Sequence, residues 1–173
     1  MVVAYIGVGS NIRPEKNIRR ALRLLATQVT INAISTFYRT DPVDRPGQPF
    51  FCNGVVRIAT DIPPAGLKER VLREIESRLD RRRTGDKSAP RTIDLDILLY
   101  GDQVIAGNGL SIPDPSIARR PFLAFPLREL APDLVLPDSG QPLNEVVGAM
   151  TAGGMEPLVD FTLAIKKEIL NEP

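Results

Sequence analysis

The sequence contains no histidine among its 173 residues. A histidine general base is therefore excluded, and a catalytic triad or zinc site of the usual kind lacks its characteristic residue. Any chemistry at this protein's site must rely on carboxylates, arginines, lysines and bound metal.

Other scarcities narrow the class of protein further. Cys52 is the single cysteine, which excludes an internal disulfide and a cysteine-rich zinc site. No apolar run approaches the ~18 to 20 residues that span a bilayer. The formal charge of +1 argues against strong attraction to nucleic acid or anionic membranes. The first residues, "MVVAYIGVGSNI", look like a strand without a basic leader, so we expect a cytoplasmic protein.

The length of 173 residues predicts one domain over residues 1–173, for which we expect a core at 2–138 and a C-terminal extension at 139–173. Strands are predicted at 2–8, 31–38, 50–60 and 92–100. Two helical stripes lie between them: Ile18, Leu22, Leu25 and Val29, then Leu67, Val71, Leu72, Ile75 and Leu79. The order β-α-β-β-α-β predicts an α+β, ferredoxin-like core with helices packed on an antiparallel sheet. Short helices are expected around 117–130, and an amphipathic tail near 160–170.

Two aspartates interrupt an apolar strand in "RTIDLDILLYG", residues 91–101. The run has period two, with Ile93, Leu95, Ile97 and Leu99 on one face and Thr92, Asp94, Asp96, Leu98 and Tyr100 on the other. Carboxylates sharing a face, with Cα atoms roughly 6.6 to 7 Å apart, require a cation between them. Oxygen ligands favour Mg²⁺ or a similar hard cation. Structural salt bridges to arginine are an equally weighted alternative.

A basic segment, "RRRTGDKSAPR", leads directly into this strand. Five of its eleven residues are basic and one is acidic, so its formal charge is +4. A solvated loop is the ordinary interpretation of such a run. Its position beside the aspartates instead favours phosphoryl transfer, which combines a metal, guanidinium groups and a loop that closes over the substrate.

Other motifs carry weaker information. "GVGSN" at 7–11 follows a strand, but Ile12 stands where a dinucleotide fingerprint needs glycine, and no P-loop pattern occurs. Phe50 and Phe51 suit a core beside a strand start. Asn53 offers an amide whose donors and acceptor could bind a flat heterocycle.

Together these segments resemble the 6-hydroxymethyl-7,8-dihydropterin pyrophosphokinases of folate biosynthesis. The resemblance covers roughly residues 3–138 and rests on five segments: "AYIGVGSNI", "FYRTDPV", "QPFFCNGVV", "PRTIDLDILLYG" and "IPDPSIARRPFLAFPLRELAPDLVLP". It implies transfer of pyrophosphate from ATP to the pterin hydroxymethyl group, with release of AMP. It also implies two Mg²⁺ ions that hold the triphosphate.

The resemblance assigns roles residue by residue. Asp94 and Asp96 match the metal ligands, and together with Arg81 and Arg91 they form the expected catalytic set. Arg81 and Arg83 belong to the loop that closes over ATP. The nucleotide-contacting positions are Glu76, Arg81, Arg83, Arg91, Ile97, Ser111 and Arg120. The pterin-binding positions are Thr40, Val43, Phe51, Asn53 and Phe122, with the ring between the two phenylalanines.

The chain departs from the family at three positions. Asp114 stands where histidine is common, Ser88 where an aromatic residue is common, and Ala89 where glycine is common. Asp114 either faces the triphosphate or caps the short helix that follows, and Pro115 and Ser116 favour the cap.

Two other functions remain open. A paralogue without catalysis is suggested by Asp114 and Ser88, although the acidic and basic residues of the site are retained. A nucleic-acid-binding module is disfavoured because no RNP1 pattern occurs. We expect a monomer that binds ATP and the pterin, with no nucleic-acid or membrane partner.

Overall fold

The computed structural model describes residues 1–42, 46–86 and 89–171. The elements up to the aspartate strand are β1 (Val2–Ser10), α1 (Pro14–Ala26), β2 (Thr30–Ile34), β3 (Tyr38–Thr40), β4 (Phe51–Thr60), α2 (Pro64–Gly66), the π-helical η1 (Leu67–Leu72), α3 (Arg73–Arg78) and β5 (Asp94–Tyr100). The later elements are β6 (Ile105–Gly107), β7 (Leu110–Ile112), the 3₁₀ helix η2 (Pro115–Ala118), α4 (Pro121–Leu130), α5 (Leu143–Gly148), β8 (Met155–Pro157) and α6 (Val159–Leu170). None of the helices described is both long and apolar enough to cross a membrane.

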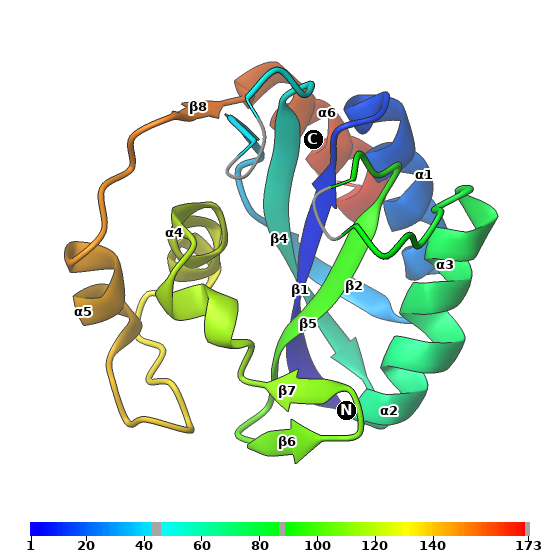
Figure 1. Cartoon of the computed structure of the whole chain (residues 1–173). Helices are drawn as coiled ribbons and strands as arrows, with labels where there is room; N and C mark the ends of the chain where they lie inside the picture. Colours follow the sequence, from blue (N-terminus) through cyan, green and yellow to red (C-terminus); the bar gives the residue numbers. More distant parts are fainter. Residues whose placement is uncertain (43–45, 87–88, 172–173) are drawn as a thin grey trace.

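Antiparallel pairing builds one sheet in the order β5-β1-β4-β3-β8, with β2 also paired to β4. Strands β6 and β7 form a separate hairpin. Helices α1, α3 and α6 cover one face of the sheet, and α4 and α5 lie on the other side (Figure 1). The predicted combination of helices with an antiparallel sheet is confirmed.

Both predicted helical stripes are buried against the sheet. The residues concerned are Ile18, Leu22, Leu25, Val29, Leu67, Val71, Leu72, Ile75 and Leu79. The second core, on the opposite face, joins Leu98 of β5 to Ala124 and Leu127 of α4 and to Val146 and Val147 of α5. The sheet is therefore a central layer covered on both faces.

The strand predicted over 31–38 is divided into β2 and β3. The division occurs at residues 36 and 37, whose backbone N–H groups donate to side chains instead of to a neighbouring strand. The Thr36 N–H donates to the Glu129 carboxylate at 3.0 Å, and the Phe37 N–H donates to the Thr162 hydroxyl at 2.9 Å. Because both partners come from distant helices, the pattern of alternation could not reveal the break.

The aspartate strand also departs from strict alternation. The pairing register of β5 on β1 shifts around Leu98, which is an irregularity that reverses side-chain faces beyond it. Leu99 consequently belongs to the core on the α4 side of the sheet and Tyr100 to the core on the α1 side, opposite to the predicted faces. The shift lies after Asp94 and Asp96, so these two side chains still share one face, as predicted.

Residues of the C-terminal extension pack onto the sheet. β8 pairs with the outer edge of β3, opposing Met155 to Thr40. Phe161 and Ile165 of α6 enter the core beneath α1, and Phe161 meets Phe37 edge-to-face at 5.5 Å between ring centroids. The amphipathic segment predicted near 160–170 is thus a packed helix.

Candidate active site

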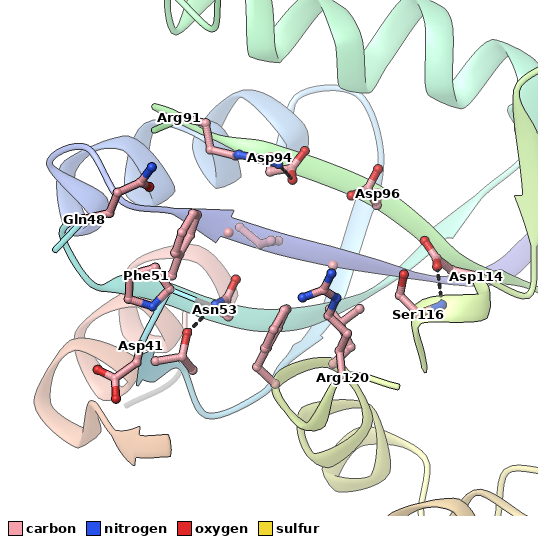
Figure 2. A pocket seen from close by; sticks show the side chains of 17 residues that line it. Asp41, Gln48, Phe51, Asn53, Arg91, Asp94, Asp96, Asp114, Ser116 and Arg120 are labelled. Atoms are coloured by element: carbon pink, nitrogen blue, oxygen red, sulfur yellow. Dashed lines mark hydrogen bonds and ion pairs between the residues drawn. The ribbon is translucent and has the colours of Figure 1, made fainter. Parts of the chain in front are cut away.

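A cavity of about 290 Å³ lies over one end of β1, β4 and β5 and is bordered by the start of α4 (Figure 2). It brings together residues that are far apart in the chain. Eight of the predicted site residues line it: Thr40, Phe51, Asn53, Arg91, Asp94, Asp96, Arg120 and Phe122.

One half of the cavity is aromatic and amide-lined. Phe51 and Phe122 both contribute to its wall and are half-buried. Asn53 is 7% exposed, and its amide donates to the Thr40 hydroxyl at 2.8 Å. Among the residues that the structure describes, the other amide N–H and the carbonyl oxygen of Asn53 have no hydrogen-bond partner, so they suit the edge of a flat heterocycle placed between the rings.

Gly9 makes this arrangement possible. It lies opposite Asn53 in the β1–β4 ladder, and a Cβ at Gly9 would stand 2.6 Å from Asn53 Oδ1. The amide therefore lies directly across the glycine. The second glycine of "GVGSN" is thus explained by a close approach of a side chain, with no need for a dinucleotide loop.

The other half of the cavity is charged. Asp94 and Asp96 rise from β5 on the same side (Figure 2). The Asp94 carboxylate is paired with Arg81 and, at 2.7 Å, with Arg91. The alternative of structural salt bridges therefore holds for Asp94, while no ion pair to Asp96 is found among the described residues.

Asp96 has an unusual protonation equilibrium. Its side chain is open to the cavity, yet desolvation by the surrounding protein raises its pKa to about 7. Negative charges on Asp94, Asp114 and Glu76 also raise this pKa, and Arg81 lowers it. The carboxylate therefore lies where an additional positive charge would stabilise it.

The acidic residues of the cavity could hold a hard cation only if other ligands completed its coordination. Within the described ranges, no cluster of three or more Asp, Glu, Cys or His is placed to hold a metal by itself. Two carboxylates, supplemented by water and by phosphate oxygens of a substrate, are a ligand set that suits Mg²⁺. The donor set thus fits a metal that arrives with a phosphorylated ligand.

Glu76 is a buried organiser of the basic residues. It is 2% exposed, and its carboxylate accepts hydrogen bonds from Arg81 at 2.6 Å, from Arg83, and from the Leu95 backbone N–H at 3.0 Å. It does not line the cavity. The Arg83 side chain is 56% exposed outside the cavity. The basic segment is thus anchored to β5 in this structure.

Two predicted nucleotide-contacting residues, Ile97 and Ser111, line a second cavity of about 250 Å³. Asp96 and Asp114 border both cavities, so the two spaces adjoin. Asp114 also accepts a hydrogen bond from the Ser116 N–H at 2.7 Å and caps η2 (Figure 2). The predicted cap is confirmed, although the helix it caps is the short 3₁₀ turn.

Comparison with known proteins identifies the architecture. Residues 5–132 match the family model described as 7,8-dihydro-6-hydroxymethylpterin-pyrophosphokinase (HPPK). The chain belongs to the HPPK family. The enzyme named 2-amino-4-hydroxy-6-hydroxymethyldihydropteridine pyrophosphokinase from Pseudomonas aeruginosa is 39% identical over 160 residues, covering 89% of this chain and 95% of the relative. Its namesake from Haemophilus influenzae is 37% identical over 152 residues, covering 85% and 92%.

Solved structures agree on the fold. The wild-type HPPK-DHPS of Plasmodium falciparum with pteroate superimposes with a TM-score of 0.70. The two chains are 14% identical, and the match covers 99% of this chain and 46% of the other. This likeness supports the shared HPPK fold alone.

The structure adds residues that the sequence analysis did not assign to the site. The cavity of about 290 Å³, called the main cavity below, is also lined by Gly7, Val8, Gly9, Asp41, Pro42, Gln48, Ser116 and Leu123. Asn11 acts indirectly: its side chain accepts from the Arg91 N–H at 2.8 Å, and its N–H donates to the Arg91 carbonyl at 3.1 Å. The "GSN" turn therefore fixes the backbone of Arg91, a role that only the tertiary contact reveals.

Val43 and Ser88, which the resemblance singles out, lie outside the described residues. The other predicted positions are distributed over the two adjoining cavities and the Glu76 network.

Proposed function

We propose that this chain transfers pyrophosphate from ATP to the hydroxymethyl group of 6-hydroxymethyl-7,8-dihydropterin, releasing AMP, in folate biosynthesis. The observation that carries this function is the composition of one cavity. Its aromatic and amide half suits a flat heterocycle, and its acidic and basic half suits a metal-bound polyphosphate. Two relatives of matching length carry the name of this pyrophosphokinase.

The pterin binds in the first half of the cavity. Its ring lies between Phe51 and Phe122, and the Asn53 amide pairs with its polar edge. Thr40 orients that amide through the 2.8 Å hydrogen bond. Val43 belongs to the same binding set by resemblance. Burial of the ring would direct its hydroxymethyl group towards the charged half.

ATP binds across the charged half and the adjoining cavity. Arg91 and Arg120 line the main cavity and neutralise phosphate oxygens. Ile97 and Ser111 contact the nucleoside in the second cavity. Arg81 and Arg83 exchange their present carboxylate partners for phosphates when the loop closes. The base of the loop stays in place because the Arg81 backbone N–H donates to the Glu76 carbonyl at 3.0 Å and the Leu95 N–H of β5 donates to the Glu76 carboxylate at 3.0 Å.

Asp94 and Asp96 would hold two Mg²⁺ ions that arrive with the triphosphate. When bound, these ions neutralise phosphate charge and align the triphosphate for in-line attack at the β-phosphorus. The rest of the rate enhancement comes from positioning, since phosphoryl transfer needs alignment and charge neutralisation more than a strong base.

Several broader features belong to the same proposal. We treat residues 1–173 as one cytoplasmic, monomeric pyrophosphokinase domain. A ferredoxin-like description of the core is supported by the order β5-β1-β4 with β2 beside β4.

The test is AMP release from ATP by the purified protein with Mg²⁺ and 6-hydroxymethyl-7,8-dihydropterin. AMP should appear only when all three are present. Asp94→Asn should abolish turnover while leaving the circular dichroism spectrum unchanged, and Asp138→Asn, at an exposed position that does not line the cavity, is the matched control. Formation of ADP, or turnover without the pterin, would contradict the proposal.

A further inference from the structure

Lys68 is the one basic residue lining the second cavity among the residues that the structure describes. The other charged residues in that lining are Asp96 and Asp114, which also border the main cavity. Lys68 lies outside the basic segment 81–91, and no motif in the sequence marks it. A single ammonium group is therefore placed at the junction where nucleoside-binding and metal-binding residues meet.

The local backbone of Lys68 is unusual. It belongs to η1, where the Arg73 N–H donates to the Lys68 carbonyl five residues earlier, the bond of a π-helical turn. Such turns are rare and are found frequently at functional sites. The hairpin β6–β7 lies near this helical segment (Figure 1). Lys68 Nζ donates to the carbonyl of Gly109, in the turn of that hairpin, at 2.5 Å.

Hydrogen-bonding capacity remains on this ammonium group. A lysine carries three N–H donors, and one of them serves Gly109. Within the described part of the chain, Lys68 forms no ion pair with a carboxylate, whereas Arg81, Arg83 and Arg91 all do. Lys68 can therefore receive an anionic ligand without first giving up an internal salt bridge.

The proposed reaction places a specific anion here. The α-phosphate joins the nucleoside, held by Ile97 and Ser111, to the β-phosphate beside Asp94 and Asp96, so it must cross the junction between the cavities. As the pterin hydroxyl oxygen bonds to the β-phosphorus, the bond from that phosphorus to the bridging oxygen breaks. The bridging oxygen leaves with the electron pair as part of AMP, and the hydroxyl proton passes to water.

We propose that Lys68 binds the α-phosphate of ATP and stabilises the charge that AMP gains as the bridging bond breaks. This inference rests on the proposed function. Arg91 and Arg120 line the main cavity and lie on the side of the transferred group, so Lys68 supplies the cation on the leaving-group side.

A purely structural role for Lys68 makes a different prediction. If its only task were to hold the Gly109 carbonyl, its removal would disturb the hairpin and affect nucleoside and nucleotide alike. A direct contact with phosphate affects only ligands that carry the phosphate. Adenosine and AMP, which differ by that one group, therefore separate the two roles.

The experiment compares Lys68→Met, Lys68→Arg and wild type, with Lys16→Met as the control that removes one exposed lysine from α1. AMP and adenosine are titrated as inhibitors of AMP release measured with radiolabelled ATP. In wild type, AMP should inhibit more tightly than adenosine. In Lys68→Met, the ratio of adenosine to AMP inhibition constants should fall by roughly 10-fold. The kcat should also fall by roughly 10-fold or more, because the variant lacks one hydrogen-bond donor that stabilises charge in the transition state. Lys68→Arg should retain most of both.

Three results would overturn the assignment. Lys68→Met could keep the wild-type preference for AMP, or weaken AMP and adenosine equally, or wild type could show no preference at all. Thermal unfolding of each variant verifies that the inhibitor data refer to folded protein, and Lys68→Arg provides the folded comparison if Lys68→Met is unstable. A wild-type protein that releases no AMP contradicts the proposed function itself, which distinguishes that failure from a failure of the Lys68 assignment.

Discussion

A methyl group added at Gly9 should selectively damage pterin binding. The new Cβ would lie 2.6 Å from Asn53 Oδ1, well inside the 3.0 Å that real Cβ contacts respect. Asn53 must therefore move, which stretches its 2.8 Å hydrogen bond to the Thr40 hydroxyl and misaligns the amide that we assign to the pterin. A lost or unsatisfied buried hydrogen bond costs about 1–3 kcal/mol, equivalent to a roughly 5- to 140-fold weaker affinity at 1.4 kcal/mol per factor of ten.

Calorimetric titration of Gly9→Ala with the pterin should show this loss, and titration with a non-hydrolysable ATP analogue should match wild type. Gly148→Ala is the matched control, because a Cβ there meets no atom within 4 Å. The decisive measurement is a double-mutant cycle. In an Asn53→Ala background, Gly9→Ala should cost almost nothing further, since the clashing group is gone. Equal losses in both backgrounds would refute the reasoning.

Three further predictions concern the charged groups. Glu76→Gln should lower the free energy of unfolding by about 3 kcal/mol in urea titrations, because it leaves Arg81 with a buried charge only partly compensated; a change below 1 kcal/mol would contradict this. Asp114→Ala should cost about 1 kcal/mol of stability through loss of the η2 cap, and Asp114→Asn much less; equal losses would contradict the cap. In metal-free buffer, Asp96→Asn should raise Tm more at pH 8 than at pH 5, because a folded-state pKa of about 7 makes ionised Asp96 unfavourable as pH rises; a pH-independent difference would contradict it.

Features set by local periodicity were predictable from the sequence. The buried stripe of α1 and the shared face of Asp94 and Asp96 follow from spacings of 3.6 and 2 residues, which need no knowledge of distant contacts. The faces of Leu99 and Tyr100 could not be predicted in this way, because the residue types around Leu98 do not indicate the shift in pairing register there.

Features that depend on residues far apart in the chain were not predictable. Asn11 fixes Arg91 across 80 positions, and the sequence indicated only a turn at "GSN". Nor did the sequence indicate that the Glu76 carboxylate, a predicted nucleotide contact, is buried with Arg81 and Arg83 as its cationic partners. The resemblance named eight residues that line one cavity, but only the fold shows which of them contact one another.

The pairing of β8 with β3 has a consequence for how the molecule is made. Thr40 lies opposite Met155, so the outer edge of β3 acquires its covering strand from a segment that the ribosome synthesises more than a hundred residues later. Until then, β3 presents unpaired backbone groups of the kind that recruit strands from other chains. β8 therefore protects the edge of β3, but it can do so only after the C-terminal segment has been synthesised. Until β8 pairs with β3, the nascent chain is more prone to aggregate through this edge.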